Sequence, residues 1–173
     1  QLTYSEIEGR RQIRALVDMA RKYGAKNGTI SLVVLPASIG IRETRHFKSQ
    51  YRLTENEVLS GRKFEDAIAN GSYRVDIHHS DCSGITFRYL DGREIIRGNG
   101  VSATKVGRWR PETTKDPTFY QIPYRAIIPT GEFKNVLMCG RMMNADPGAF
   151  GAVRVMVNLN QMGKLQVLLP ILR

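Results

Sequence analysis

The sequence is poor in cysteine and has no long apolar run. Only Cys82 and Cys139 occur among 173 residues, so a disulfide framework of the kind that staples small secreted domains is not expected. No apolar stretch approaches the roughly 20 residues that cross a bilayer, and no signal-peptide pattern is present. These absences exclude a membrane span and favour the cytoplasm, although they leave the localisation otherwise open.

Acidic side chains are scarce relative to basic ones. The sequence contains 16 Asp and Glu residues and 26 Lys and Arg residues, which gives a net charge of +10. Such a charge permits binding to nucleic acid, to anionic lipid, or to an anionic cofactor or substrate. The Arg108-Trp109-Arg110 triplet could stack on bases, but a charge run of this kind is more typical of a solvated loop. We therefore expect no nucleic-acid partner.

Familiar catalytic and metal-binding motifs are also missing. Neither a Ser/His/Asp set nor a C-x-x-C motif is evident, so no catalytic residue is assigned. Potential metal ligands gather at Asp76, His78, His79, Asp81 and Cys82. Their spacing is too cramped for a usual structural zinc site, which needs two separated ligand pairs. We predict that the chain holds no metal.

The patterns that are present mix helical and strand periods. They predict an α+β fold, in which helices flank a mostly antiparallel sheet, and a chain of one domain or little more. A capping box at Thr54 and Glu57 starts one helix, and Asp91-Gly92 signals a hairpin turn. Helices are expected over 3–23, over 55–70 with a break or bend near Ser60-Gly61, and over 151–162. Strands are expected over 29–35, 44–53, 73–79, 85–90, 119–128 and 135–140, and a loop over 98–118.

Long ordered segments resemble one family. In chain order they read "EIEGRRQ", "GIRETRHFKSQYRLTENEVLSGRKFEDAIANGSYRVDIHH", "YQIPYRAIIP" and "NVLMCGRMMNADPGAFGAVRVMVNLNQMG". Together they resemble the C-terminal, substrate-domain half of bacterial FAD-dependent oxidoreductases of the glutathione-reductase-like two-domain type. The resemblance covers residues 5–163. It implies a flavoenzyme substrate-binding domain, with FAD as the cofactor of the parent family and hydride transfer as the reaction.

The chain departs from that family at two places. No G-x-G-x-x-G turn follows a strand, so the Rossmann part that grips the FAD pyrophosphate is missing. We therefore expect no tightly bound FAD and a possible dinucleotide-binding partner chain. The apolar ending "KLQVLLPILR" is unlike the family and is hypothesised to be a frameshift product, which the coding DNA would test. The expected parts are a substrate-domain-like region 1–134, a flavin-contacting strand and helix 135–163, and a tail 164–173.

The resemblance implies a flavin-contacting surface near the C-terminus. A strand is expected to end at Gly140, and a helix is expected to begin near Gly151, with its N–H groups facing the flavin pyrimidine oxygens. Glycine would keep side chains out of the approach. An ordinary strand–loop–helix connection is the alternative. The implied cofactor-binding residues are Gly140, Arg141, Gly151, Ala152, Val153 and Arg154.

The implied substrate-binding residues are Arg42, Arg45, His78 and Tyr124. An arginine of "GIRETR" could hold an anionic group in a bidentate manner, although an Arg–Glu pair that fixes strand geometry is the alternative. Alternation along a strand places Arg42 and Arg45 on opposite faces, so both cannot serve one site. A hydrogen-bonded structural role is the alternative for His78, and strand packing is the alternative for Tyr124.

Two functions follow. In the first, the chain is the substrate-binding portion of an FAD-dependent oxidoreductase, and it transfers hydride only when a dinucleotide-binding part completes it. In the second, it is a non-catalytic remnant of a disrupted flavoenzyme gene that self-associates. Without a Rossmann part, apolar residues near the C-terminus would lose their cover, so a homo-oligomer, preferably a dimer, is expected. These residues are Val153, Val155, Met156, Val157 and Leu159, to which the tail adds Leu165, Val167, Leu168, Leu169, Ile171 and Leu172.

Overall fold

The fold is α+β, as the sequence predicts. The computed structural model describes residues 1–24, 30–80, 83–98, 104–132 and 135–168. The chain divides into two compact units, Gln1–Arg42 (unit 1) and Glu43–Arg173 (unit 2), and each is described by itself. Within the described ranges, no helix is both long enough and apolar enough to cross a membrane.

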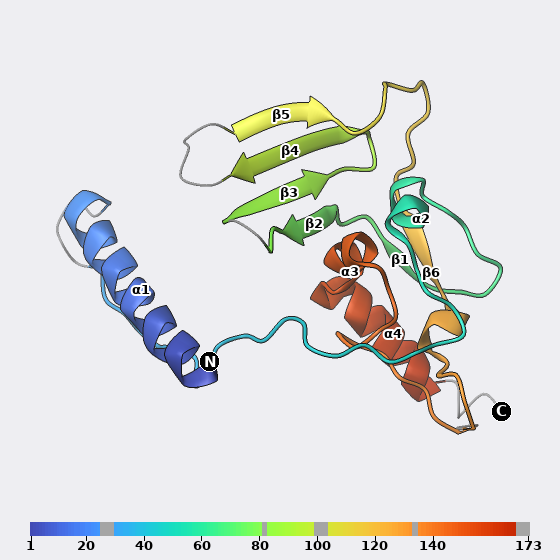
Figure 1. The fold of residues 1–173 in the computed structure, drawn as a ribbon, viewed down its shortest axis with the longest axis horizontal. Coiled ribbons are helices and arrows are strands. Elements are labelled where there is room, and N and C mark those ends of the chain that lie inside the picture. The colour runs from blue at the N-terminus through green and yellow to red at the C-terminus, as the bar shows by residue number, and fades with distance from the viewer. Residues whose placement is uncertain (25–29, 81–82, 99–103, 133–134, 169–173) are drawn as a thin grey trace. The chain divides into compact units, whose positions relative to one another are not determined.

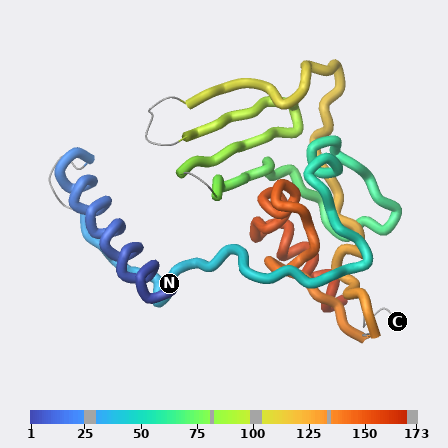
Figure 2. Tube along the Cα trace, in the orientation of Figure 1, coloured from blue at the N-terminus to red at the C-terminus, as the bar shows by residue number. Residues whose placement is uncertain are grey.

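Unit 1 consists of one helix and a returning segment. Helix α1 (Leu2–Tyr23) agrees with the predicted helix over 3–23. Residues 30–39 return along it, and two hydrogen bonds of 2.7 Å tie them down (Figure 2). In one, Arg21 Nε donates to the Ile30 carbonyl oxygen, and in the other the Ile39 N–H donates to Glu6 Oε1.

The buried strand predicted over 29–35 is wrong. Residues 30–35 form no strand, Val33 is 93% exposed, and Val34 and Leu32 are exposed as well. Residue 29 lies outside the described residues. A β-branched run forms a strand only where another strand pairs with it, and unit 1 supplies none among its described residues.

Unit 2 contains two antiparallel sheets (Figure 1). The smaller sheet pairs β1 (Ala67–Gly71) with β6 (Tyr120–Pro123). The larger sheet has the order β2-β3-β4-β5, with bounds Val75–His78, Gly84–Arg88, Arg93–Gly98 and Thr104–Arg108. The predicted hairpin between β3 and β4 is confirmed: Gly92 adopts φ +87°, a conformation that favours glycine.

The helices of unit 2 are short. Helix α2 (Glu55–Leu59) begins with the predicted capping box at Thr54 and Glu57, which is confirmed. A 3-10 helix η1 (Tyr124–Ile127) follows β6. Helices α3 (Pro147–Val153) and α4 (Met156–Leu168) complete the unit, and α4 runs without a break from Gly163 into the first five residues of the predicted tail. The rest of the predicted tail, including Pro170, lies outside the described residues.

Several predicted boundaries are wrong because pairing partners distant in sequence decide them. The helix predicted to reach residue 70 ends at Leu59, since Gly61 adopts φ +65° and residues 67–71 pair with β6. The loop predicted over 98–118 contains β5, and residues 135–140 form no strand. Residues 44–53 show the predicted alternation of burial from Phe47 onward, but they make only isolated bridges rather than a strand.

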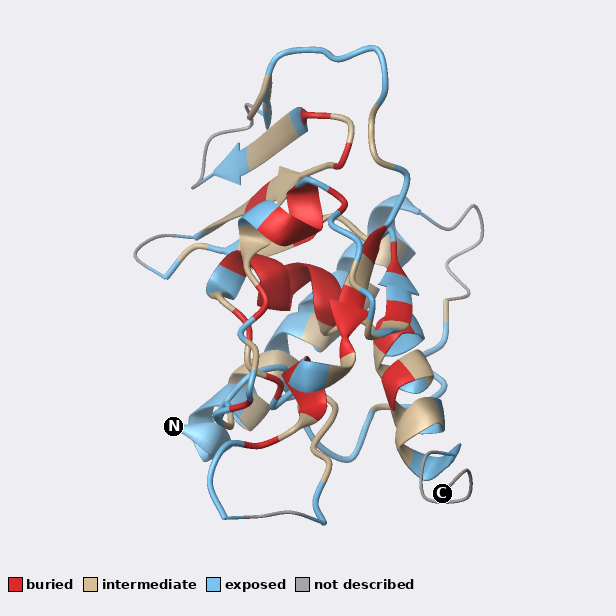
Figure 3. Cartoon of the chain, turned by 90° about the vertical axis from the view of Figure 1, so that its right-hand side faces the viewer, coloured by how far each residue is buried: buried red, intermediate tan, exposed pale blue. Residues whose placement is uncertain are grey.

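The core of unit 2 lies between α3, α4, β1 and β6. Helix α3 is buried from Gly148 to Val153. Figure 3 shows the degree of burial along the whole chain. The largest fully buried apolar side chains come from α3, α4 and β6 and from connecting segments: Tyr120, Phe150, Leu53, Ile122, Ile127, Met143 and Met162. This core fixes α3 against β2, where the predicted site residues meet.

Candidate functional site

A buried carboxylate on β2 lies between two predicted site residues. His78 Nε2 lies 3.5 Å from Asp76 Oδ1, and Arg154 Nη2 lies 3.8 Å from Asp76 Oδ2. The exposed fractions are 13% for the Asp76 side chain, 12% for Arg154 and 43% for His78. Asp76 Oδ1 is buried without a hydrogen-bond partner. The three side chains form a charged cluster, the Asp76 cluster, that reaches solvent through His78.

The strand period and a helix end assemble this cluster. Asp76 and His78 are two residues apart on β2 and therefore share one face of the sheet. Arg154 is the C-cap of α3. Gly151 brings that helix against β2, because a Cβ there would lie within 3.0 Å of the carbonyl oxygen, carbonyl carbon and nitrogen of Asp76. Glycine is thus needed here for packing within the chain.

An arginine packed on aromatic rings adjoins the cluster. The guanidinium carbon of Arg74 lies 4.1 Å from the ring centroid of Phe87, with the rings of Tyr73 and Tyr89 at 5.1 and 5.7 Å. Phe87 is the residue directly opposite Asp76 in the β2–β3 register, so both lie on the same face. Arg74 Nε is buried without a hydrogen-bond partner. This face therefore combines aromatic surface with unused hydrogen-bonding capacity.

A buried polar network fixes the junction of α3 and α4. The Tyr120 hydroxyl donates to the Ala152 carbonyl oxygen at 3.0 Å. Asn158 Nδ2 donates to the Tyr120 hydroxyl oxygen at 3.0 Å and to the Ala152 carbonyl oxygen at 3.2 Å. Burial raises the pKa of Tyr120 well above its usual value, so it remains a neutral donor. The network holds Ala152 in place two residues before Arg154.

The predicted helix start near Gly151 is wrong. Helix α3 begins four residues earlier, and its N-terminus is occupied by Asp146, whose carboxylate accepts from the Ala149 and Glu55 N–H groups at 2.8 Å. The helix that begins beyond Gly151 is α4, which starts at Met156. The preceding Val155 has no side-chain acceptor, and α4 has no acidic residue in its first turn.

The start of α4 is open to solvent. Met156 and Val157 are 77% and 69% exposed, although both are apolar. The first N–H groups of a helix lack intrahelical partners. The start of α4 therefore offers backbone donors beside exposed apolar side chains, two residues after Arg154. The Asp76 cluster and this helix start form the candidate site.

The other implied cofactor residues have different surroundings. Gly140 adopts φ +101°, so glycine is required by its backbone conformation. Arg141 is exposed. The Gly140 carbonyl oxygen accepts from the Met143 N–H at 3.2 Å, and the Phe47 N–H donates to the neighbouring Met142 carbonyl oxygen at 3.0 Å. Ala152 and Val153 are fully buried in the core and hold α3 rather than face solvent.

The substrate residues implied by the resemblance are only partly brought together. His78 joins the cluster, whereas Arg42 ends unit 1 and the exposed Arg45 belongs to unit 2. Tyr124 begins η1, is half-buried against the core, and donates its N–H to the Asp66 carbonyl oxygen at 2.6 Å. It thus follows the sheet of β1 and β6, while His78 lies on the other sheet.

Sequence reasoning missed the centre of the cluster. It considered Asp76 only as a metal ligand and overlooked Arg74. Both could have been found, since "YRVDIHH" places Arg74, Asp76 and His78 at alternate positions of one strand face. Within the described part of the chain, no group of three or more His, Cys, Asp or Glu could hold a metal ion. Asp81 and Cys82 lie outside it.

The basic 108–110 triplet is tied into unit 2. Trp109 Nε1 donates to the Tyr89 carbonyl oxygen at 2.7 Å, and Arg110 Nη2 contacts the Leu90 carbonyl oxygen and Asp116, each at 2.7 Å. Hydrogen bonds from Thr113 and, less strongly, from Arg110 lower the pKa of Asp116. These contacts give the triplet a structural role.

Comparison with known proteins finds one match. A family model described as FAD dependent oxidoreductase matches residues 1–165. No curated protein and no solved structure matches the chain. The match spans both units, including α1, the whole of β2 and α3, and the start of α4. The chain belongs to the FAD-dependent oxidoreductase family.

Proposed function

We propose that this chain supplies the substrate-facing portion of an FAD-dependent oxidoreductase, together with the surface that holds the flavin edge. The reaction is hydride transfer between a substrate and the flavin. One observation carries the proposal: the Asp76 cluster joins His78, implied to face substrate, to Arg154, implied to face flavin, through one buried carboxylate.

The residues present fit the edge of a flavin. That edge carries two carbonyl oxygens and one N–H group, which need donors and an acceptor. Arg154 and the open start of α4 provide donors, and the apolar Met156 and Val157 provide a surface for a ring. FAD, when bound, supplies the group that accepts or releases hydride.

His78 is the residue that handles a proton. Its imidazole is partly exposed and adjoins Asp76, whose carboxylate orients the ring. A hydroxyl or amine substrate loses a proton when it gives up hydride, and His78 can accept that proton. Arg154 Nη2 lies 3.8 Å from Asp76 Oδ2 and places a positive charge beside the carboxylate that adjoins the imidazole.

In this proposal, the FAD pyrophosphate is bound by residues outside this chain's described site. A dinucleotide is held by a Gly-rich turn at a helix N-terminus, and the sequence contains no such turn. The N-terminus of α3 is already occupied by Asp146. A dinucleotide-binding partner chain, or a further segment, is therefore needed to complete the enzyme.

We expect the isolated chain to bind riboflavin and FAD with similar, weak affinity, both with dissociation constants above about 1 μM. If only the ring edge is held, the adenosine diphosphate part adds little. Quenching of flavin fluorescence in about 0.3 M salt measures both constants, since salt of this strength suppresses nonspecific attraction to the +10 charge.

The matched variants are Arg154→Gln, which should weaken riboflavin binding, and Arg125→Gln, which should not. Arg125 is an exposed arginine that pairs with Asp66 at 2.9 Å. FAD binding about 100-fold tighter than riboflavin would contradict the proposal, because the chain would then grip the dinucleotide itself. A chain that binds neither flavin would favour the non-catalytic, self-associating alternative.

The homo-oligomer remains a prediction, but the structure changes which residues could form its interface. Val153 is fully buried, so it does not lack cover, but Met156, Val157 and Val167 are exposed on α4. Burying one such side chain contributes about 1.5–3 kcal/mol. We expect light scattering to give a dimeric mass at tens of micromolar protein, and Val157→Lys to shift it toward the monomer. A monomeric mass for the unmodified chain would exclude this dimer.

A further inference from the structure

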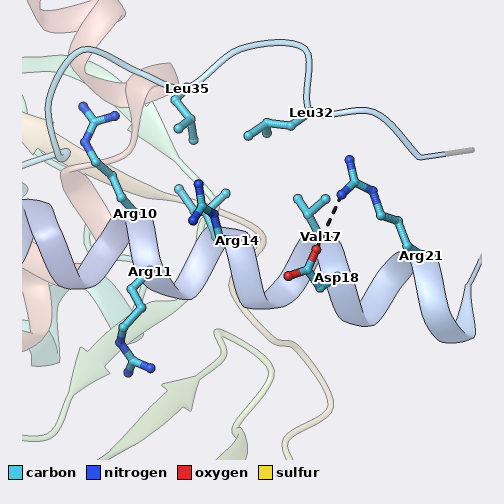
Figure 4. A pocket seen from close by; sticks show the side chains of 9 residues that line it. Arg10, Arg11, Arg14, Val17, Asp18, Arg21, Leu32 and Leu35 are labelled. Carbon is cyan, nitrogen blue, oxygen red and sulfur yellow. Dashed lines mark hydrogen bonds and ion pairs between the residues drawn. The ribbon is translucent and has the colours of Figure 1, made fainter.

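Unit 1 contains a groove that the proposed flavin chemistry does not use. It runs between α1 and the returning segment and encloses about 580 Å³. Figure 4 shows Leu32 and Leu35 reaching from the returning segment toward α1. Val17 and Ile13 form the apolar side of the helix. The volume is within the range of ligand sites, about 300–1,000 Å³, but the groove is open along one side.

Arginines line this groove along its length. Arg10, Arg14 and Arg21 follow one side of α1, and the first and last of them are eleven residue positions, or about 16 Å of helix, apart. Arg11 also lines the groove at its edge, but Figure 4 shows its side chain directed away from Leu32 and Leu35. Arg11 is already paired with Glu8 at 2.7 Å, and this pairing raises the pKa of Arg11.

The central arginine of the groove has spare capacity. Arg10 donates to the Ala37 carbonyl oxygen at 3.3 Å, and Arg21 is held by Ile30 and Asp18. Among the described residues of unit 1, none forms a hydrogen bond or ion pair with Arg14. Residues 1–42 carry seven Lys and Arg against three Asp and Glu. The groove is therefore apolar along its floor and positive along one wall.

Helix α1 also lacks cover. None of its 22 residues is buried, and Leu16 and Met19 are exposed on it. Packing of an apolar face usually supplies most of the stability of a helix in a protein. Within unit 1, described by itself, the apolar side chains of α1 and of the returning segment therefore leave the groove uncovered.

We infer that the groove binds an acidic amphipathic helix of a partner protein. Carboxylates spaced along such a helix would face Arg10, Arg14 and Arg21, and its leucines would fill the apolar floor. A second copy of α1 would instead bring arginine against arginine, and a small anion would leave Leu32 and Leu35 in water. The charge pattern and the length of the groove thus favour an acidic helix over a second copy of α1 or a small anion.

The test uses the full chain and a labelled synthetic helical peptide of about 16 residues, long enough to span the groove. On one face the peptide carries three Glu at spacings of four and seven residues, with Leu between them. We expect micromolar binding by fluorescence anisotropy that weakens in salt and falls about tenfold in Arg14→Glu, since an attraction becomes a repulsion. Arg11→Glu is the matched control and should change binding less than about twofold. Circular dichroism checks that both variants keep α1.

Several outcomes would overturn the inference. One is equal weakening by Arg14→Glu and Arg11→Glu, and another is equal binding of a peptide with Lys in place of Glu. Displacement of the peptide by millimolar pyrophosphate would assign the groove to a small anion. A dimer, seen by light scattering, that Arg14→Glu dissociates would assign it to a second copy. None of these readouts involves flavin, so they are independent of the proposed oxidoreductase function.

Discussion

Replacing Gly151 with alanine is expected to lower the free energy of unfolding by about 2 kcal/mol or more. The new methyl group would lie within 3.0 Å of three main-chain atoms of Asp76, and a strand backbone cannot move aside as a flexible side chain can. Overpacking of this kind typically costs about 1–3 kcal/mol, occasionally more. The alanine returns roughly 0.5–1 kcal/mol, because glycine inside a helix is unfavourable.

The matched control is Gly163→Ala. Gly163 also lies inside a helix, α4, but an added methyl group there would meet no described atom within 4 Å apart from its chain neighbours and the adjacent backbone of its own helix. The same substitution should there stabilise the protein by roughly 0.5–1 kcal/mol. Chemical denaturation of both variants without flavin gives the comparison. Equal effects at the two positions would show that α3 can shift from β2, and would return Gly151 to the role implied by the resemblance, clearance for a flavin.

Three local signals in the sequence were read correctly. The helix over 3–23, the capping box at Thr54 and the hairpin at Gly92 each depend on residues close together in the chain. The helix predicted for the segment "AIANG" was wrong because its structure depends on residues far away in the chain. Its alanines favour a helix, but pairing with β6 places residues 67–71 in a strand.

The candidate site was predictable in its parts but not as a whole. The resemblance implied His78 and Arg154 separately, one for substrate and one for flavin. Their meeting at Asp76 depends on how α3 packs against β2, and this packing depends on Gly151 and on the buried Tyr120–Asn158 network. A one-dimensional pattern carries no signal for a contact between residues 76 and 154.

Helix α2 is the element that holds α3 from its other side. The Glu55 N–H donates to the Asp146 cap of α3 at 2.8 Å. Glu55 Oε1 accepts from Arg88 of β3 at 2.7 Å, and the Glu55 side chain fills the space beside Gly148. The position of α2 depends in turn on Glu57, a largely buried carboxylate. A substitution at Glu57 should therefore weaken the packing of α3 against α2.

We expect Glu57→Ala to lower the free energy of unfolding by about 3 kcal/mol. The Glu57 carboxylate accepts hydrogen bonds from the Tyr51 hydroxyl and from the Thr54 N–H at 3.0 Å, and it pairs with Arg62 at 2.5 Å. Loss of a helix cap costs about 1 kcal/mol, and loss of hydrogen bonds to a charged group costs about 1.5–3 kcal/mol. Glu65→Ala, which removes an exposed carboxylate nearby, should change stability by less than about 0.5 kcal/mol.

The same residue should make stability depend on acid. Burial by itself raises the pKa of Glu57, but the hydrogen bonds from Tyr51 and Thr54 and the charge of Arg62 outweigh it, so the pKa lies below 4.5 in the folded chain. A carboxylate with a lowered folded pKa contributes stability above pH 4.5, and this contribution is lost as the pH falls through the folded pKa. The gap in unfolding free energy between the unmodified chain and Glu57→Ala should therefore be constant from about pH 7 to about pH 5 and narrow below pH 4.5. Urea denaturation at about pH 7, 5, 4 and 3 measures it, and a gap that widens on acidification would mean that the carboxylate is strained rather than stabilised in the fold.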